Sequence, residues 1–247
     1  MRSKGEVKKS SADKPLISVI TVVFNGEKHF EQTTQSVIGQ SYSNIEYVVI
    51  DGGSTDGTIE ILKRYNDKID YWISERDTGI YDAMNKGLDA AKGEWIYFLG
   101  SDDVLNDSTT ISDVVAFLAL DVSLVFGNIM YNNGKLVKSR LNIFTLLHNT
   151  VHHQSAFYNA NLFRNWRYDS RLRLIADYET NLRIYLNEMK YRYINKTIAV
   201  CNQSGQSRSN LKQAFLETNI VRNKYISGVS GMIFSLLYFF KFKIKSG

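Results

Sequence analysis

The chain has 247 residues and a mass of 28.3 kDa, which is enough for one large hydrophobic core. Hydrophobic residues make up 44% and charged residues 22%, so the composition excludes a disordered or low-complexity protein. The chain contains one cysteine, Cys201, and four scattered histidines, which excludes a disulfide scaffold and a cysteine-rich zinc module.

The net charge of +5 is concentrated at the two ends of the chain. Residues 1–14 carry +3, residues 15–207 carry −4 and residues 208–247 carry +6. A nucleic-acid-binding protein normally carries its positive charge on the folded body, so the acidic body argues against nucleic acid as a partner. The opening residues contain no apolar h-region and therefore do not form a secretory signal. We interpret residues 1–15 as a disordered basic lead.

From Leu16 onward, apolar runs alternate with helical patterns. Successive β–α units predict a mainly parallel sheet with helices on both faces, and the Val, Ile, Tyr and Phe of the apolar runs are typical of strands buried on both sides. The predicted fold class is therefore α/β, with a doubly wound, mostly parallel sheet. The four strand and helix pairs are expected at residues 17–24 and 27–38, 45–50 and 58–65, 69–74 and 80–91, and 94–99 and 109–120.

The β–α rhythm changes after residue 122. Asn132, Asn133 and Gly134 separate two short apolar runs, which predicts a hairpin and therefore added antiparallel strands within residues 123–139. A helix is expected at about residues 176–188, and a strand at about residues 191–200.

The C-terminal segment differs from the rest of the chain. Residues 225–240 are uncharged and are followed by Lys-Phe-Lys-Ile-Lys. A helix of this length spans about 24 Å, which is short of the roughly 30 Å hydrocarbon core of a bilayer. We interpret residues 208–247 as a tail that lies on, or dips into, an anionic membrane surface. The alternative is an apolar helix that packs back on the domain.

Carboxylates follow three of the four expected parallel strands, at the edge where doubly wound folds bind ligands. Acids that converge at one edge repel one another unless a cation lies among them, and oxygen ligands suit Mg²⁺ or Mn²⁺. A divalent cation is therefore expected, although each loop taken alone also has the composition of an ordinary turn or helix cap. The four strand ends are residues 24–26, 51–57, 75–79 and 100–103.

The loops after the strands also suit phosphate groups, because they open helices with free backbone N–H groups. No G-x-x-x-x-G-K-[ST] motif is present, and no G-x-G-x-x-G follows the first strand. This argues against an ordinary nucleoside triphosphatase and against a dinucleotide-dependent dehydrogenase. The ligand that remains a candidate is a nucleotide-diphosphate donor whose diphosphate is bridged by the cation.

Several stretches, in this order, resemble family 2 glycosyltransferases of the GT-A fold, in particular the bacterial branch that builds surface polysaccharides. They are ISVITVVFNGE, VIDGGSTDGT, SERDTGIYDAMNKGLDAAKGEWIYFLGSDD, HHQSAFY and ADYETNLR, within an expected GT-A domain over residues 16–207. The resemblance implies an inverting transfer of one hexosyl or N-acetylhexosaminyl unit, with a UDP-sugar as the favoured donor. The expected acceptor is a lipid-linked saccharide, and the expected location is the inner face of the cytoplasmic membrane. The Q-x-x-R-W motif of processive synthases is absent.

The resemblance also assigns site residues. Asp177 is the expected catalytic base, with Glu179 as the alternative, and a helix N-cap is the structural alternative for Asp177. Asp102 and Asp103 are the expected metal ligands, with His153 as a further candidate. Asp51 is expected to receive the base of the nucleotide. The full set of expected donor-binding residues is Phe24, Asn25, Asp51, Ser54, Asp77, Asn85 and Asp102.

The chain departs from the family pattern at Gly100, where the first acid of the D-x-D motif is missing. The division of metal binding between Asp102 and Asp103 therefore stays open.

Two functions other than glycosyl transfer also stay open. A nucleotidyltransferase normally has a glycine-rich basic loop after its first strand, where this chain supplies only Lys28. A domain of the same fold can also bind nucleotides or proteins without turnover.

Overall fold

The computed structural model describes residues 8–11, 13–202 and 210–246. Residues 1–7 and 12 of the expected lead, and the expected domain boundary after residue 207, lie outside the described residues. Within the described part of the lead, Nζ of Lys8 lies 2.8 Å from a carboxylate oxygen of Asp70.

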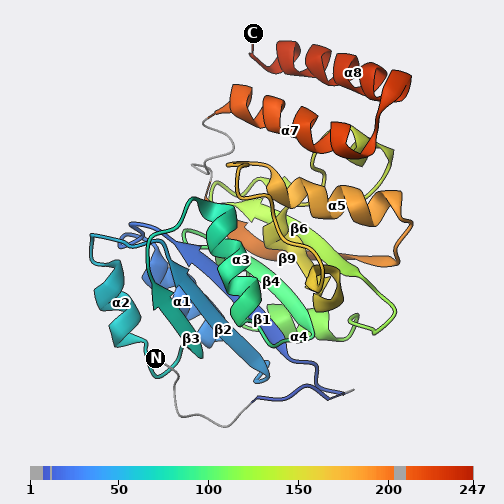
Figure 1. Cartoon of the computed structure of the whole chain (residues 1–247). Coiled ribbons are helices and arrows are strands. Elements are labelled where there is room, and N and C mark those ends of the chain that lie inside the picture. The colour runs from blue at the N-terminus through green and yellow to red at the C-terminus, as the bar shows by residue number, and fades with distance from the viewer. Residues whose placement is uncertain (1–7, 12, 203–209, 247) are drawn as a thin grey trace.

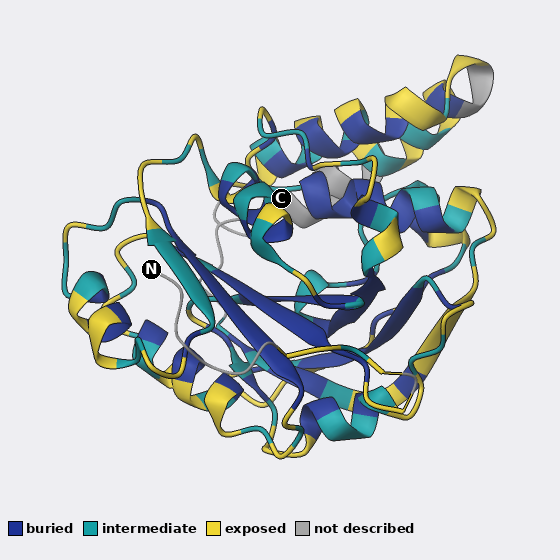
Figure 2. Cartoon of the chain, turned by 60° about the horizontal axis from the view of Figure 1, so that its bottom comes forward, coloured by how far each residue is buried: buried dark blue, intermediate teal, exposed yellow. Residues whose placement is uncertain are grey.

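Four parallel strands form one half of a single sheet, in the spatial order β3, β2, β1, β4. Their side chains are buried on both faces of the sheet except in β3, which lies at the edge (Figure 2). The continuous apolar runs of the sequence are therefore explained by burial on both sides. The bounds are β1 (Ile17–Val23), β2 (Ile45–Asp51), β3 (Tyr71–Ser74) and β4 (Trp95–Gly100).

The other half of the sheet is mixed. β8 pairs antiparallel with β4 and β6, β6 and β9 are parallel, and β5 pairs antiparallel with β9. β6 and β7 form the predicted antiparallel hairpin. The two-residue strand β5 was not predicted, because two residues carry no periodic pattern. The bounds are β5 (Val104–Leu105), β6 (Leu124–Tyr131), β7 (Leu136–Val137), β8 (Ala156–Asn159) and β9 (Tyr191–Cys201).

Helices cover both faces of the sheet, as predicted (Figure 1). One core lies between the sheet and α1, α2 and α4, and a second lies between the sheet and α3 and α5. The expected helix at 109–120 ends at Val115, because the following residues form turns with short-range hydrogen bonds. The bounds are α1 (Phe30–Ile38), α2 (Thr58–Arg64), α3 (Ile80–Ala90), α4 (Thr110–Val115) and α5 (Ala176–Leu186).

Two further helices, α7 (Leu211–Tyr225) and α8 (Gly228–Ser246), stack outward from α5 (Figure 1). The ring of Tyr238 in α8 stacks on Phe215 of α7, with 5.2 Å between the ring centroids. α8 therefore packs on α7, the other helix of the tail. No described helix is long and apolar enough to cross a bilayer.

Buried polar side chains connect α7 to the domain. The carboxylate of Glu217 is 1% exposed and accepts hydrogen bonds from the backbone N–H groups of Arg173, Leu174 and Ile175, at 2.9, 2.8 and 3.1 Å. These N–H groups belong to the three residues immediately before α5, of which Ile175 is the N-cap, so the carboxylate lies near the positive end of that helix. Glu217 thus fixes the N-terminus of α5 from another helix.

We expect Glu217→Ala to lower the free energy of unfolding by at least about 2 kcal/mol, because it leaves three backbone donors without their buried acceptor. Lys212→Ala, at an exposed position of the same helix, is the matched control. Urea unfolding followed by circular dichroism measures both. Equal stability of the two variants would contradict this role of Glu217.

Candidate functional site

The loops after β1 and β2 are joined by hydrogen bonds at the carboxyl edge of the sheet. The backbone N–H of Asn25 donates to Oγ of Ser54 at 2.8 Å, and the backbone N–H of Thr55 donates to Oδ1 of Asn25 at 2.9 Å. Asn25 adopts a φ of +50°, which turns the chain sharply after β1. The preceding residue, Phe24, is 63% exposed. The joined loops hold an aromatic ring at the surface beside the strand ends.

Asp51 is fully buried at the end of β2, and neighbouring groups donate hydrogen bonds to both oxygens of its carboxylate. Oδ2 accepts from the backbone N–H groups of Gly53 and Ser54, at 3.1 and 3.0 Å, and from the hydroxyl of Ser74 at 2.6 Å. Oδ1 accepts from the hydroxyl of Ser54. Asp51 therefore shapes the loop that positions Ser54 against Asn25.

Asp77 follows β3 and lies against the backbone of Gly52. Its Oδ1 accepts from the N–H of Gly79 at 2.9 Å, whereas its Oδ2 occupies the space that a Cβ at Gly52 would need. Burial raises the pKa of Asp77 above its ordinary value. The glycine at position 52 is thus required by the close approach of the Asp77 carboxylate.

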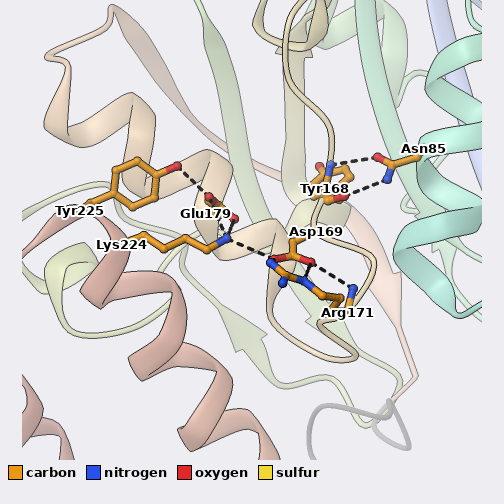
Figure 3. A network of polar contacts seen from close by, with 7 residues as sticks. All are labelled: Asn85, Tyr168, Asp169, Arg171, Glu179, Lys224 and Tyr225. Atoms are coloured by element: carbon orange, nitrogen blue, oxygen red, sulfur yellow. Dashed lines mark hydrogen bonds and ion pairs between the residues drawn. The ribbon is translucent and has the colours of Figure 1, made fainter.

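Asn85, an expected donor-binding residue, holds another segment of the chain. Its Nδ2 donates to the carbonyl of Tyr168, and its Oδ1 accepts from the N–H of Tyr168, both at 2.9 Å (Figure 3). Both ends of the amide are therefore engaged with the backbone that precedes α5.

The carboxylates of Asp102 and Asp103 lie together after β4. Asp102 is exposed and Asp103 is buried. Oδ1 of Asp103 accepts from the N–H of Asn202 at 2.9 Å, and Oδ2 accepts from Nε2 of Gln154 at 3.0 Å. Burial, and then the charge of Asp102, raise the pKa of Asp103.

Gly100 makes room for these two carboxylates. A Cβ at position 100 would lie 2.6 Å from Oδ2 of Asp103 and 3.4 Å from Oδ1 of Asp102. Both carboxylates therefore turn toward the same side of the glycine. The Asp103 carboxylate occupies the space of the side chain that the D-x-D motif would place at position 100.

The donor set suits a divalent cation with few protein ligands. Among the described residues, no group of three or more His, Cys, Asp or Glu side chains is arranged to bind a metal ion. Mg²⁺, however, is usually held by one or two carboxylates and completes its coordination with water and substrate phosphates. Asp102 and Asp103 supply two carboxylates on the same side of Gly100, so these residues fit such an ion.

Asp177 lies in the first turn of α5 and is buried. Its Oδ2 accepts from Nδ2 of Asn149 at 3.0 Å and lies 3.2 Å from Nδ1 of His153. Its Oδ1 accepts from the hydroxyl of Tyr81 in α3 at 3.3 Å. Three side chains from separate segments therefore orient this carboxylate.

Glu179, in contrast, faces α7. Its carboxylate accepts a hydrogen bond from the hydroxyl of Tyr225 at 2.7 Å and lies 3.3 Å from Nζ of Lys224 (Figure 3). The two acids of α5 thus contact different parts of the molecule, and Asp177 is the acid beside α3 and the short helix η2 (His153–Ser155).

η2 connects the two groups of acids. His153 contacts Asp177, and the next residue, Gln154, contacts Asp103. Sequence reasoning missed Gln154, Tyr81 and Asn149 as site residues. The HHQSAFY stretch contained a signal for Gln154, whereas the contact between Asn149 and Asp177 leaves no pattern in the sequence.

Comparison with known proteins finds a family model and relatives that match most of the chain. The model of the family described as "Glycosyl transferase family 2" matches residues 18–215. A "PGL/p-HBAD biosynthesis glycosyltransferase" of Mycobacterium bovis is 33% identical over 204 residues, which cover 77% of this chain and 78% of the relative. An "uncharacterized glycosyltransferase" of Mycobacterium tuberculosis is 35% identical over 182 residues, which cover 70% of each chain. These relatives are named as glycosyltransferases, which argues against the nucleotidyltransferase alternative.

Solved structures confirm the predicted GT-A fold. Staphylococcus aureus TarS (residues 1–349) in complex with UDP-GlcNAc has a TM-score of 0.70 at 19% identity, over 91% of this chain and 71% of that chain. The mannosyltransferase PcManGT of Pyrobaculum calidifontis, in complex with GDP-Man and Mn²⁺, has a TM-score of 0.68 at 18% identity, over 94% and 71%. At these identities the likeness shows the fold.

We expect Asp51→Ala to destabilise the protein by about 3 kcal/mol, because it removes a buried carboxylate that accepts four hydrogen bonds. For a chain of this size, that loss lowers the melting temperature by roughly 6–12 °C. Thr55→Ala, at an exposed position of the same loop, is the control. Thermal unfolding of both variants checks the prediction, and equal melting temperatures would contradict it.

Proposed function

Since the chain belongs to glycosyl transferase family 2, we propose that it transfers one sugar at a time, with inversion, from a nucleotide-diphosphate donor in a metal-dependent reaction. A UDP-sugar is the favoured donor, and a lipid-linked saccharide of a surface polysaccharide is the proposed acceptor. The proposed location is the inner face of the cytoplasmic membrane. The nucleotide sugars bound by TarS and PcManGT, and the Mn²⁺ of PcManGT, support the donor class and the metal.

One observation carries the proposal. Neighbouring residues of η2 link the Asp102–Asp103 pair to Asp177, through Gln154 and His153 respectively. An inverting displacement needs a stabilised leaving group and, across the reacting carbon, a base for the acceptor hydroxyl. The two contacts of η2 support the proposal that these acids serve one site.

On the donor side, Asp102 and Asp103 would hold the cation, which when bound neutralises charge on the departing diphosphate. Gln154 and the backbone of Asn202 hold Asp103 in place. The other proposed donor contacts come from the ends of β1, β2 and β3 and from α3, and they are Phe24, Asn25, Asp51, Ser54, Asp77 and Asn85.

On the acceptor side, Asp177 is the proposed base. A carboxylate has about four lone-pair sites. Asn149, His153 and Tyr81 contact Asp177 at three of them, so one site is left for the proton of an acceptor hydroxyl. The three contacts fix the orientation of the carboxylate.

We expect Asp177→Asn to lower kcat by about 10²- to 10⁴-fold, because the amide accepts no proton from the acceptor. The affinity for the nucleoside diphosphate stays unchanged. Glu179→Gln, the same change on the same helix, is the matched control and retains activity. UDP release from a panel of UDP-sugars, together with UDP calorimetry, measures both effects. Wild-type turnover by Asp177→Asn would contradict the assignment.

The surface of α8 supports the membrane part of the proposal. Large apolar side chains of this helix remain exposed although the helix packs on α7, and three lysines follow them in the sequence. An apolar face beside basic residues is typical of helices that lie on anionic bilayers. The exposed side chains are Met232, Ile233, Leu236, Leu237 and Phe239.

We expect the double substitution Ile233→Glu and Leu237→Glu to weaken binding to vesicles of phosphatidylcholine and phosphatidylglycerol at least about 10-fold, because it places charge on the lipid-facing surface. Leu120→Glu is the control at another exposed leucine, outside the tail. Vesicle cosedimentation measures the binding. Unchanged binding of the double variant would rule out this surface as the anchor.

A further inference from the structure

A second polar side chain of α5, that of Asn181, lies on the same face of the helix as Asp177. The two residues are four positions apart, which brings their side chains together one turn along a helix. Asn181 is fully buried. A buried amide needs acceptors for its N–H groups and a donor for its oxygen. The partners of Asn181 therefore reveal which way its amide is turned.

The orientation of the Asn181 amide follows from a partner that can only accept. Its Nδ2 donates to the backbone carbonyl of Val151 at 2.9 Å, and a carbonyl oxygen has no proton to give. At the other end, the hydroxyl of Tyr158 in β8 donates to Oδ1 of Asn181 at 3.0 Å. Burial raises the pKa of Tyr158 well above its ordinary value, so this hydroxyl keeps its proton. The amide of Asn181 is thus held in one orientation from both ends.

Asn181 in turn sets the orientation of Asn149. Its Nδ2 also donates to Oδ1 of Asn149, at 2.9 Å, which leaves Nδ2 of Asn149 to donate to Oδ2 of Asp177 at 3.0 Å. If the amide of Asn149 were reversed, its oxygen would face the carboxylate, and two acceptors would meet with no hydrogen between them. The link from the carbonyl of Val151 to the carboxylate of Asp177 therefore runs through two amides of fixed orientation.

We infer that Asn181 is a positioning residue for the proposed base, because it fixes the amide of Asn149 so that this amide donates to Asp177. The inference rests on the proposed function, in which Asp177 takes the proton of the acceptor hydroxyl. Asn181 acts through Asn149 and needs no contact with the substrate. The alternative is a purely structural role, in which Asn181 only attaches the loop at Val151 to α5.

The first test is the change Asn181→Leu, which keeps a branched side chain and removes its hydrogen bonds. We expect kcat to fall about 10- to 100-fold, because the carboxylate is no longer held in the orientation that proton transfer requires. The KM for the UDP-sugar and the affinity for UDP stay unchanged, because the donor side of the site is intact. UDP release from a panel of UDP-sugars, and UDP calorimetry with Mn²⁺, measure these effects.

A second variant at the same position is Asn181→Ser. The serine hydroxyl stops one atom short of the position of Nδ2, so it should lose kcat in the same way while making a smaller change in the core. Thermal unfolding establishes that each variant is folded.

Tyr158→Phe is the control for a structural role. It removes the hydrogen bond to Oδ1 of Asn181, and it leaves the carbonyl of Val151 to orient the amide. We expect a lower melting temperature, because a buried acceptor loses its donor, together with the kcat of the wild type. A purely structural role of Asn181 predicts instead that Tyr158→Phe and Asn181→Leu lose kcat alike.

A double-mutant cycle tests whether Asn181 acts through Asn149. Asn149→Ala removes the donor to Asp177 directly and leaves the sequence of α5 unaltered. It should lower kcat about as much as Asn181→Leu does. The double variant should lose no more than Asn149→Ala alone, because two residues that act through one hydrogen bond do not have additive effects.

The outcomes distinguish this inference from the proposed function. Wild-type kcat in the folded Asn181 variants, or a double variant whose loss is the product of the two single losses, would overturn the role of Asn181 and leave Asp177 as the base. Wild-type turnover by Asp177→Asn, or a wild-type protein that releases UDP from no sugar of the panel, would overturn the proposed function and the inference together.

Discussion

Carboxylates that converge at one edge of a parallel sheet repel one another, and the arrangement of this site depends on how that repulsion is offset. The carboxylate of Asp51 is stabilised by hydrogen bonds from its own loop, and that of Asp103 by hydrogen bonds from Gln154 and the backbone of Asn202. Asp177 is held by Asn149, His153 and Tyr81. Asp102 remains exposed and is available to a cation. Hydrogen bonds thus fix the buried acids, and the exposed Asp102 is accessible to a cation.

Two glycines show how the sheet accommodates so many acids. At the end of β2, Gly52 leaves space for the carboxylate of Asp77, and at the end of β4, Gly100 leaves space for that of Asp103. In both places the carboxylate belongs to a residue elsewhere in the chain and occupies the volume that a side chain at the glycine would fill. The departure from D-x-D at Gly100 is therefore compatible with a carboxylate at the same point in space.

Much of the fold was predictable because it depends on local patterns. The four β–α units, the β6–β7 hairpin, α5 and β9 follow from apolar periodicity and turn residues. α7 was not predicted, because its buried side includes Glu217 and Arg222, which do not form an apolar stripe. The contact of Gln154 with Asp103 joins residues 51 positions apart, and the approach of Asp77 to Gly52 depends on the packing of β2 beside β3. Such contacts join residues that are far apart in the sequence, so no local sequence pattern predicts them.

The most direct test of a shared site for metal and nucleotide is a titration with Mn²⁺ in the absence and presence of UDP, and then of GDP, corrected for Mn²⁺ bound by the free nucleotide. Two ligands that complete one another's coordination must raise each other's affinity by the same factor. We expect one of the two nucleotides to raise the Mn²⁺ affinity at least about 10-fold, and Asp102→Asn to abolish the increase. An Mn²⁺ affinity that neither nucleotide changes would contradict a metal-bridged donor site at the end of β4.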